Sequence, residues 1–148
     1  MKKLYYAAHA YMIVGLVGGL YYREITKLND FTGDSQLGLV HTHVLALGML
    51  FFLIALVLEK LFTLSAGRLF NAFFWTYNAG LVMTVAVMTV RGTLTVLGHS
   101  TPGIAAHIAG GGHIALTVGL VFFFINLGKR IAQAPATTDR EERRSPAS

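Results

Sequence analysis

The sequence predicts an all-α integral membrane protein, a four-helix bundle with both termini in the cytoplasm. Of its 148 residues, 54% are hydrophobic and only 13% are charged, whereas about 25% of the residues of a soluble domain are charged. The apolar residues are gathered in four blocks, each close to the roughly 20 residues that cross a bilayer as a helix. The cationic side chains are distributed unevenly between the connecting segments, which predicts an orientation.

Each block is nearly free of charge and is bounded by polar or charged residues. Lipid offers no hydrogen-bond partner to free backbone groups, so each block is expected to be helical. The predicted spans are residues 4–22, 39–58, 72–97 and 103–127. Residues 1–130 then form one four-helix domain. Residues 131–148 are rich in Ala, Pro, Thr, Ser, Arg and Glu, which predicts a disordered cytoplasmic tail.

Charge and cysteine content narrow the classes of protein. With the N-terminus inside, nine Lys and Arg residues lie on the inner side and three on the outer side, which favours this orientation in a bacterial inner (plasma) membrane surrounded by lipid. The net charge of +5 comes mostly from residues at helix ends, so no nucleic-acid binding is predicted. The chain has no cysteine, which excludes disulfides, thiolate zinc sites, iron–sulfur clusters and cysteine nucleophiles.

Histidines are the most informative side chains. Ionisable groups inside a membrane are costly and therefore candidates for function. Five of the six are expected in one outer layer, and only His9 lies near the inner boundary. The five are His41, His43, His99, His107 and His113. In a regular helix, His41 and His43 point about 200° apart, and His107 and His113 differ by about 120° in direction and about 9 Å in height.

This pattern favours a flat cofactor held between helices. A b-type haem needs one or two imidazole ligands and an apolar slot. Gly111 and Gly112 stand directly before His113 and would leave room for the macrocycle, although the glycines could instead permit close helix packing. The outer side also carries cations for the haem propionates, namely Arg91, Arg23 and Lys27. Gly15 and Gly19 have the small-xxx-small spacing of a helix–helix interface.

The stretch Leu39-Val40-His41-Thr42-His43 is similar to the histidine-bearing helix of haem–copper oxidase catalytic subunits (cytochrome c oxidase subunit I). In that family the first histidine binds the high-spin haem and the second binds the low-spin haem. The wider chain resembles a small uncharacterised bacterial family of four-span proteins related to that subunit. The matching stretches are residues 22–29, 31–33, 41–43, 89–92 and 112–113.

The departures from the oxidase pattern are large. The chain has far fewer spans than an oxidase subunit, and it has no clear counterpart of the copper-site histidines, the cross-linked tyrosine or a proton channel. Oxygen reduction with proton pumping is therefore not expected. A haem site remains, and a homodimer would surround it with further spans.

Depth and the oxidase resemblance together favour His43 with His113 as the axial pair of a haem b. His41 could serve a second haem with His107, or hydrogen-bond near a propionate, so one or two haems per chain are predicted. Exchanging His41 and His43 is nearly as good. The expected function is electron transfer, from quinol or another redox partner, or binding or redox chemistry of oxygen or nitric oxide. A histidine-based copper site and a non-catalytic assembly or sensor subunit are the alternatives.

Overall fold

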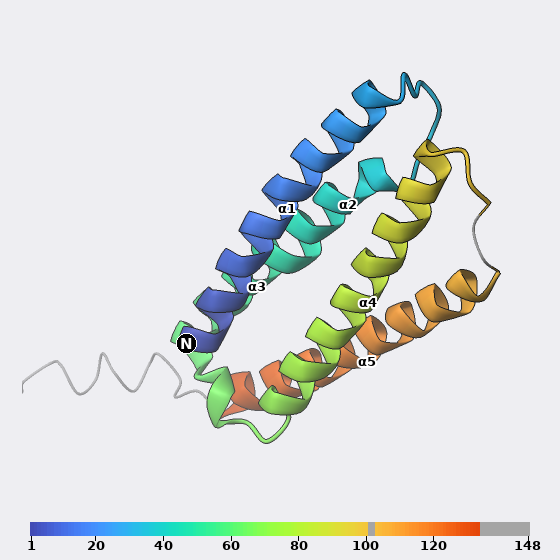
Figure 1. The fold of residues 1–148 in the computed structure, drawn as a ribbon. Coiled ribbons are helices and arrows are strands. Elements are labelled where there is room, and N and C mark those ends of the chain that lie inside the picture. Colours follow the sequence, from blue (N-terminus) through green and yellow to red (C-terminus); the bar gives the residue numbers. More distant parts are fainter. Residues whose placement is uncertain (101–102, 134–148) are drawn as a thin grey trace, which may run out of the picture.

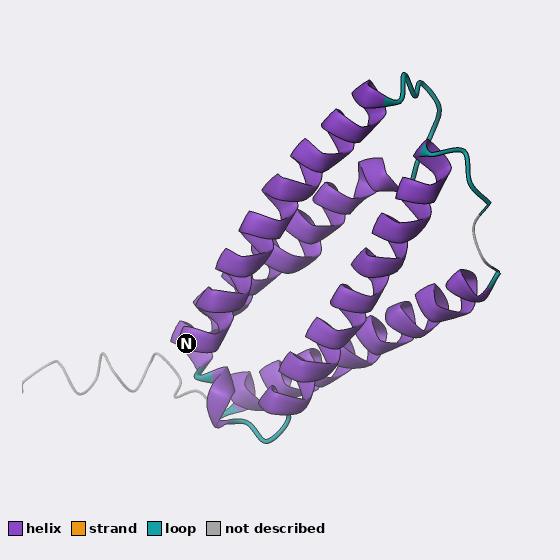
Figure 2. Cartoon of the chain, in the orientation of Figure 1, coloured by secondary structure: helices purple, strands orange, loops and turns teal. Residues whose placement is uncertain are grey.

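A computed structural model describes residues 1–100 and 103–133 of the chain. Every regular element within these residues is a helix. The elements are α1 (Lys2–Leu28), α2 (Leu37–His43), the π-helix η1 (Val44–Leu50), α3 (Phe51–Phe62), the 3-10 helix η2 (Leu64–Ala66), α4 (Phe70–Val96) and α5 (Ile104–Ala132). Because α2, η1 and α3 join end to end, the chain has four long helices, and no strand occurs in the described residues (Figure 2).

All four long helices are long and apolar enough to cross a membrane. Each extends a few residues beyond its predicted apolar block, because polar residues at the ends of a span can stay helical in the headgroup region. The largest extension is at α1, which continues past Tyr22 to Leu28. The last helix, α5, ends at Ala132, two residues inside the segment assigned to the tail. The rest of that predicted tail, residues 134–148, lies outside the described residues.

The helices form two pairs. α1 packs along α2, η1 and α3, and α4 packs along α5; α4 also contacts α2 and η1. The N-terminus and the end of α5 lie together at one end of the bundle (Figure 1). We call this end, with the connection 63–69, the Met1 end. The opposite end, with residues 29–36 and 97–100, is the far end.

Close packing of α1 confirms the predicted interface at Gly15. A Cβ atom added there would lie 2.6 Å from Leu45 Cδ2, which is closer than real carbon atoms approach. A Cβ atom at Gly19 would meet His41 Cβ at 3.7 Å, an ordinary contact. Small residues let membrane helices approach in this way, where van der Waals packing replaces the hydrophobic effect as the main attraction.

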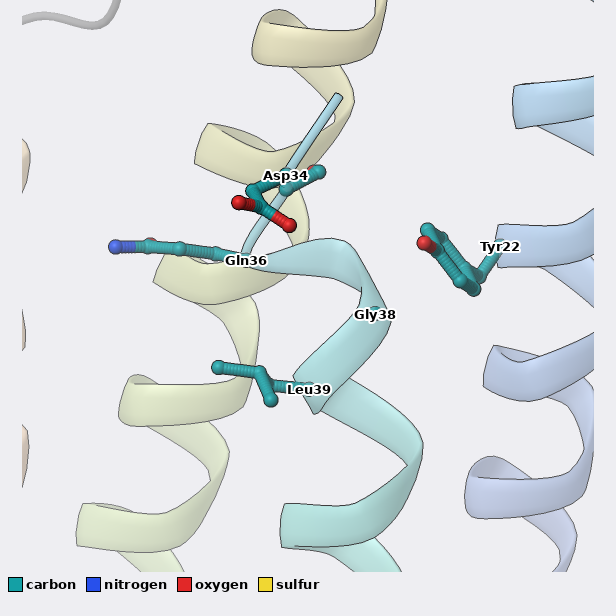
Figure 3. A pocket seen from close by; sticks show the side chains of 6 residues that line it. Tyr22, Asp34, Gln36, Gly38 and Leu39 are labelled. Atoms are coloured by element: carbon teal, nitrogen blue, oxygen red, sulfur yellow. The ribbon is translucent and has the colours of Figure 1, made fainter. Parts of the chain in front are cut away.

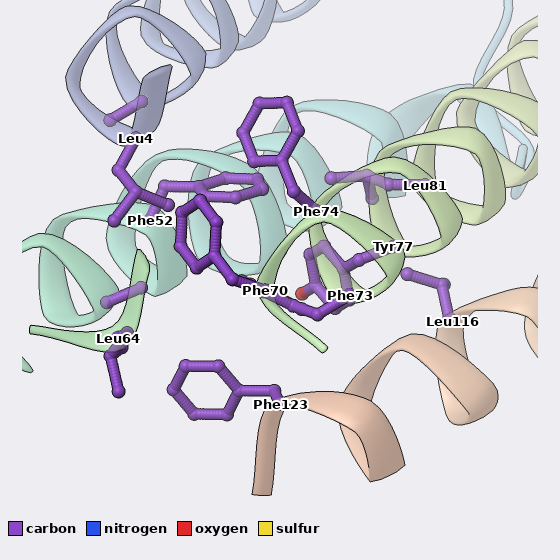
Figure 4. Packing of buried hydrophobic residues seen from close by; sticks show 12 residues of the cluster. Leu4, Phe52, Leu64, Phe70, Phe73, Phe74, Tyr77, Leu81, Leu116 and Phe123 are labelled. Carbon is purple, nitrogen blue, oxygen red and sulfur yellow. The ribbon is translucent and has the colours of Figure 1, made fainter. Parts of the chain in front are cut away.

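Aromatic rings hold α3, α4 and α5 together toward the Met1 end (Figure 4). The Phe51 and Tyr77 rings stack with centroids 4.4 Å apart, and the Phe73 and Phe123 centroids are 5.0 Å apart. The buried Tyr77 hydroxyl donates a hydrogen bond to Leu47 O at 2.9 Å. The cluster therefore fixes the registration of η1, α4 and α5 against one another.

Candidate histidine site

One face of α4 packs against both η1 and α5. Tyr77 lies on this face, because its hydroxyl bonds to Leu47 of η1 while a Cβ atom added at Gly119 of α5 would lie 2.9 Å from Tyr77 Cα. Thr84 and Arg91 follow at intervals of seven residues and share that face of the helix. The side of α4 between η1 and α5 thus carries Tyr77, Thr84 and Arg91 in order from the Met1 end.

The two histidine-bearing helices do not touch. Among the described residues, neither α2 nor η1 contacts α5, although α3 does, through a Phe51–Phe123 ring pair with centroids 5.3 Å apart. Figure 1 shows α2 and the start of α5 well apart, on either side of α4 in this view. The predicted axial pair of His43 and His113 requires the second and fourth spans to face each other. They meet only toward the Met1 end, and farther along α4 alone connects them.

His43 and His113 have the same local arrangement. His43 Nδ1 donates a hydrogen bond to Leu39 O at 2.9 Å, and His113 Nδ1 donates to Ala109 O at 2.8 Å. A backbone carbonyl only accepts, so the hydrogen of each neutral ring must be on Nδ1. Nε2 then carries the lone pair. Histidines that ligate metals are commonly oriented by such a bond from the other ring nitrogen.

The two rings also lie at similar depth. Leu47, one helical turn from His43, is level with Tyr77 through its hydrogen bond. Gly112, the neighbour of His113, lies against Thr84 and Gly80 of α4. Both histidines are therefore near the level of α4 residues 80–84.

His41 is turned toward α1. Its Cβ lies against Gly19, and its Nδ1 is buried without a hydrogen-bond partner. Because α2 is a regular helix up to His43, the two histidines point to opposite sides, as the sequence predicts. Because Nδ1 is buried, any ligand would have to reach the Nε2 atom of His41.

His113 is exposed, and so are the three remaining histidines, whereas His41 and His43 are half-buried. His107 is on the surface of α5 near its start, and His99 follows the end of α4. The His9 ring stacks on Tyr5 with centroids 6.0 Å apart. Within residues 1–100 and 103–133, no three His, Cys, Asp or Glu side chains come together to hold a metal ion.

Of the three glycines before His113, Gly112 serves helix packing. A Cβ atom added at Gly112 would lie 2.5 Å from Thr84 Oγ1 and 3.1 Å from Thr84 N. At Gly111 the nearest atom would be Met83 Cε at 3.6 Å, and at Gly110 nothing lies within 4 Å. Gly112 thus brings α5 onto the backbone of α4, which was the alternative interpretation of this run. The Thr84 hydroxyl is buried there without a partner.

The three predicted cations are not gathered in one place. Arg91 is partly buried on the same face of α4 as Thr84. Arg23 and Lys27 are exposed at the far end of α1, where Arg23 Nε lies 3.8 Å from Glu24 Oε1. Only Arg91 is on the helix face between the two histidine-bearing helices.

A cavity of about 540 Å³ lies at the start of α2 (Figure 3). Its lining residues are Tyr22, Asp34, Ser35, Gln36, Gly38 and Leu39. Leu39 is also the residue whose carbonyl accepts the hydrogen bond of His43. Sequence reasoning missed this cavity because it depends on the fold of the connection, in which Ser35 Oγ donates to Gly92 O of α4 at 2.9 Å.

The fold defines a class of small all-α proteins with four helices long and apolar enough to cross a membrane, and with histidines on α1, α2 and α5. The chain belongs to the family described as Protein of unknown function (DUF2871), which matches residues 1–130. No curated protein and no solved structure matches. The family match agrees with the four-span family expected from the sequence, and it shows no link to haem–copper oxidases.

Proposed function

We propose that this protein is a membrane cytochrome that binds haem b and transfers electrons, with His43 and His113 as axial ligands. The observation that carries the proposal is the matched pair of Nδ1 hydrogen bonds to Leu39 O and Ala109 O. In a neutral ring, such a bond places the hydrogen on Nδ1, so that Nε2 has a lone pair to offer an iron. A bound haem would supply one-electron chemistry, and two imidazole ligands favour electron transfer over gas binding.

The surroundings of the pair support this ligand set. The two imidazoles are at similar depth on helices that both pack against α4. The same face of α4 carries Arg91 toward the far end, where its cation suits a haem propionate. A haem needs only two protein ligands, because its porphyrin supplies the other four, so a cluster of three side chains is not required.

The proposal includes a setting in the bacterial inner membrane with both termini in the cytoplasm. The bias of Lys and Arg toward the Met1 end supports that orientation. A homodimer is the proposed assembly, because α5 leaves several large apolar side chains exposed in a single chain. They include Ile104, Ile114, Val118, Val121 and Ile125.

A quinol is the proposed electron donor. The cavity at the start of α2 is lined by a phenol, a carboxylate and an amide, from Tyr22, Asp34 and Gln36. Such groups can hydrogen-bond a quinol ring, and a carboxylate can accept its proton. Leu39 connects this cavity to His43 through the Leu39 carbonyl.

Visible spectroscopy tests the proposal. The protein would be purified in mild detergent after expression with added haem, then examined oxidised, reduced with dithionite, and reduced with carbon monoxide. Sharp reduced α and β bands that carbon monoxide does not move are expected. A shift with carbon monoxide would instead show an open iron and favour gas binding. A colourless protein would refute the haem proposal, and metal analysis for copper would follow.

Single substitutions test the ligands. His43→Ala and His113→Ala are each expected to abolish the low-spin spectrum or to release the haem. His9→Ala is the matched control, because its ring lies on α1 near the Met1 end and should leave the spectrum unchanged. Equal spectra in all three variants would refute the assignment of the ligands.

A further inference from the structure

A second cavity, of about 350 Å³, lies at the Met1 end, away from the histidines. It is formed where the connection between α3 and α4 meets the end of α5. Its lining residues are Ala66, Gly67, Arg68, Leu69, Asn126, Lys129, Arg130 and Gln133.

The cavity is strongly basic. Arg68, Lys129 and Arg130 line it, and no carboxylate does. Among the described residues, the closest acidic residue along the chain is Glu59, which accepts a hydrogen bond from Ser65 N at 2.7 Å and lies outside the lining. Three cations around one cavity, with no carboxylate of residues 1–100 or 103–133 in its lining, make a site that favours an anion.

The cavity is also built from fixed groups. Arg130 Nε donates to Phe62 O at 3.0 Å, and Arg130 Nη1 donates to Gln133 Oε1 at 2.7 Å. These bonds hold the guanidinium in place and leave Nη2 without a partner among the described residues. Asn126 is 3% exposed and donates from Nδ2 to Leu64 O at 2.9 Å, which fastens the connection to α5.

The site is at the level of the lipid headgroups. It lies where α3 ends at Phe62 and α4 begins at Phe70. Trp75 is 65% exposed one turn into α4, and Tyr5 and Tyr6 are exposed on α1 near the same end. Exposed aromatic rings at the ends of spans are typical of the membrane interface.

We infer that this cavity binds the phosphate headgroup of an anionic phospholipid. A guanidinium and two further cations match a phosphate oxyanion in charge and hydrogen-bonding capacity, and basic pockets between membrane helices are a known form of headgroup site. The exposed Phe124 of α5 offers an apolar surface on the same helix for the acyl chains. The inference does not depend on the proposed haem.

Native mass spectrometry of the full chain in detergent tests the inference, with titration of phosphatidylglycerol, phosphatidylcholine or inorganic phosphate. The test variant is Arg68→Gln/Lys129→Gln. The control is Lys2→Gln/Lys60→Gln, which removes the same charge from exposed side chains outside the cavity. The test variant should bind phosphatidylglycerol about 30-fold more weakly than the control, because two cations near the headgroup are lost.

Three results would overturn the inference. Equal phosphatidylglycerol affinity in the two double variants would show that only net charge matters. Equal binding of phosphatidylcholine would show that the headgroup charge is not recognised. Displacement of the lipid by millimolar inorganic phosphate would identify a free-phosphate site. Both double variants should unfold at the same temperature as the parent, because neither removes a buried group. Arg130→Lys is a further test variant, which retains the positive charge but loses the hydrogen bond to Phe62 O.

Discussion

Replacement of Gly112 by alanine distinguishes the two roles proposed for the glycines before His113. The added Cβ would lie 2.5 Å from Thr84 Oγ1 and 3.1 Å from Thr84 N. The second of these is a backbone atom, so α5 must move away from α4. Gly110→Ala is the matched control, because its Cβ would have nothing within 4 Å.

The difference between the variants isolates the packing effect. Both exchange a helical glycine for alanine and gain the same backbone contribution of about 0.5–1 kcal/mol. Overpacking at a tight contact costs about 1–3 kcal/mol and applies only at Gly112. Gly112→Ala should therefore be about 1–3 kcal/mol less stable than Gly110→Ala. For a chain of this size, that corresponds to about 2–4 °C per kcal/mol in the unfolding midpoint.

Thermal unfolding in detergent, followed by circular dichroism, measures this difference. A midpoint for Gly112→Ala equal to that of Gly110→Ala would refute the close approach of α5 to α4 at this position. If Gly112→Ala kept its stability but lost haem, room for the macrocycle would be the correct role of Gly112.

Three further outcomes follow from the candidate site. Arg91→Gln should weaken haem binding about tenfold, as expected for loss of a charge-assisted hydrogen bond. Arg91→Lys should retain most of the affinity for haem. Unchanged haem affinity in Arg91→Gln would show that Arg91 does not bind a propionate. Asp34→Asn should slow haem reduction by a soluble quinol at least tenfold, in line with the loss of a general base. The rate of reduction by dithionite should not change. Equal rates of reduction by quinol in the variant and the parent would exclude the cavity at the start of α2 as the quinol site. Co-expression of His43→Ala and His113→Ala chains should leave the low-spin spectrum absent, because both ligands belong to helices packed on one α4; its recovery would show that two copies share each haem.

His41 and His43 show how much of the local structure the sequence predicts. His41 and His43 stand in an uninterrupted apolar segment, so their helix and their opposite directions followed from spacing alone. The π-helix that begins at Val44 has no such signal in the pattern of apolar residues. It changes the rotation of every later side chain on that span relative to a regular helix.

At Gly112, the sequence could not distinguish a role in ligand binding from a role in helix packing. A glycine in a membrane helix can clear space for a ligand or for a neighbouring backbone, and both uses leave the same sequence. Only the position of Thr84 against it shows that the neighbour is α4. The basic cavity at the Met1 end likewise joins Arg68 to Lys129, which are far apart in the chain and meet only after folding.

The sequence by itself determined that there are four long helices and where they lie along the chain, because the length and polarity of a span are set by the thickness of the bilayer. The tertiary structure alone decided that α4, rather than the second span, is the main neighbour of α5. The physical reason is that lipid is as apolar as a protein core. A membrane helix is hydrophobic on every side, so the pattern of its apolar residues does not show which face packs against the other helices. Close contacts at residues such as Gly15 and Gly112 determine that face.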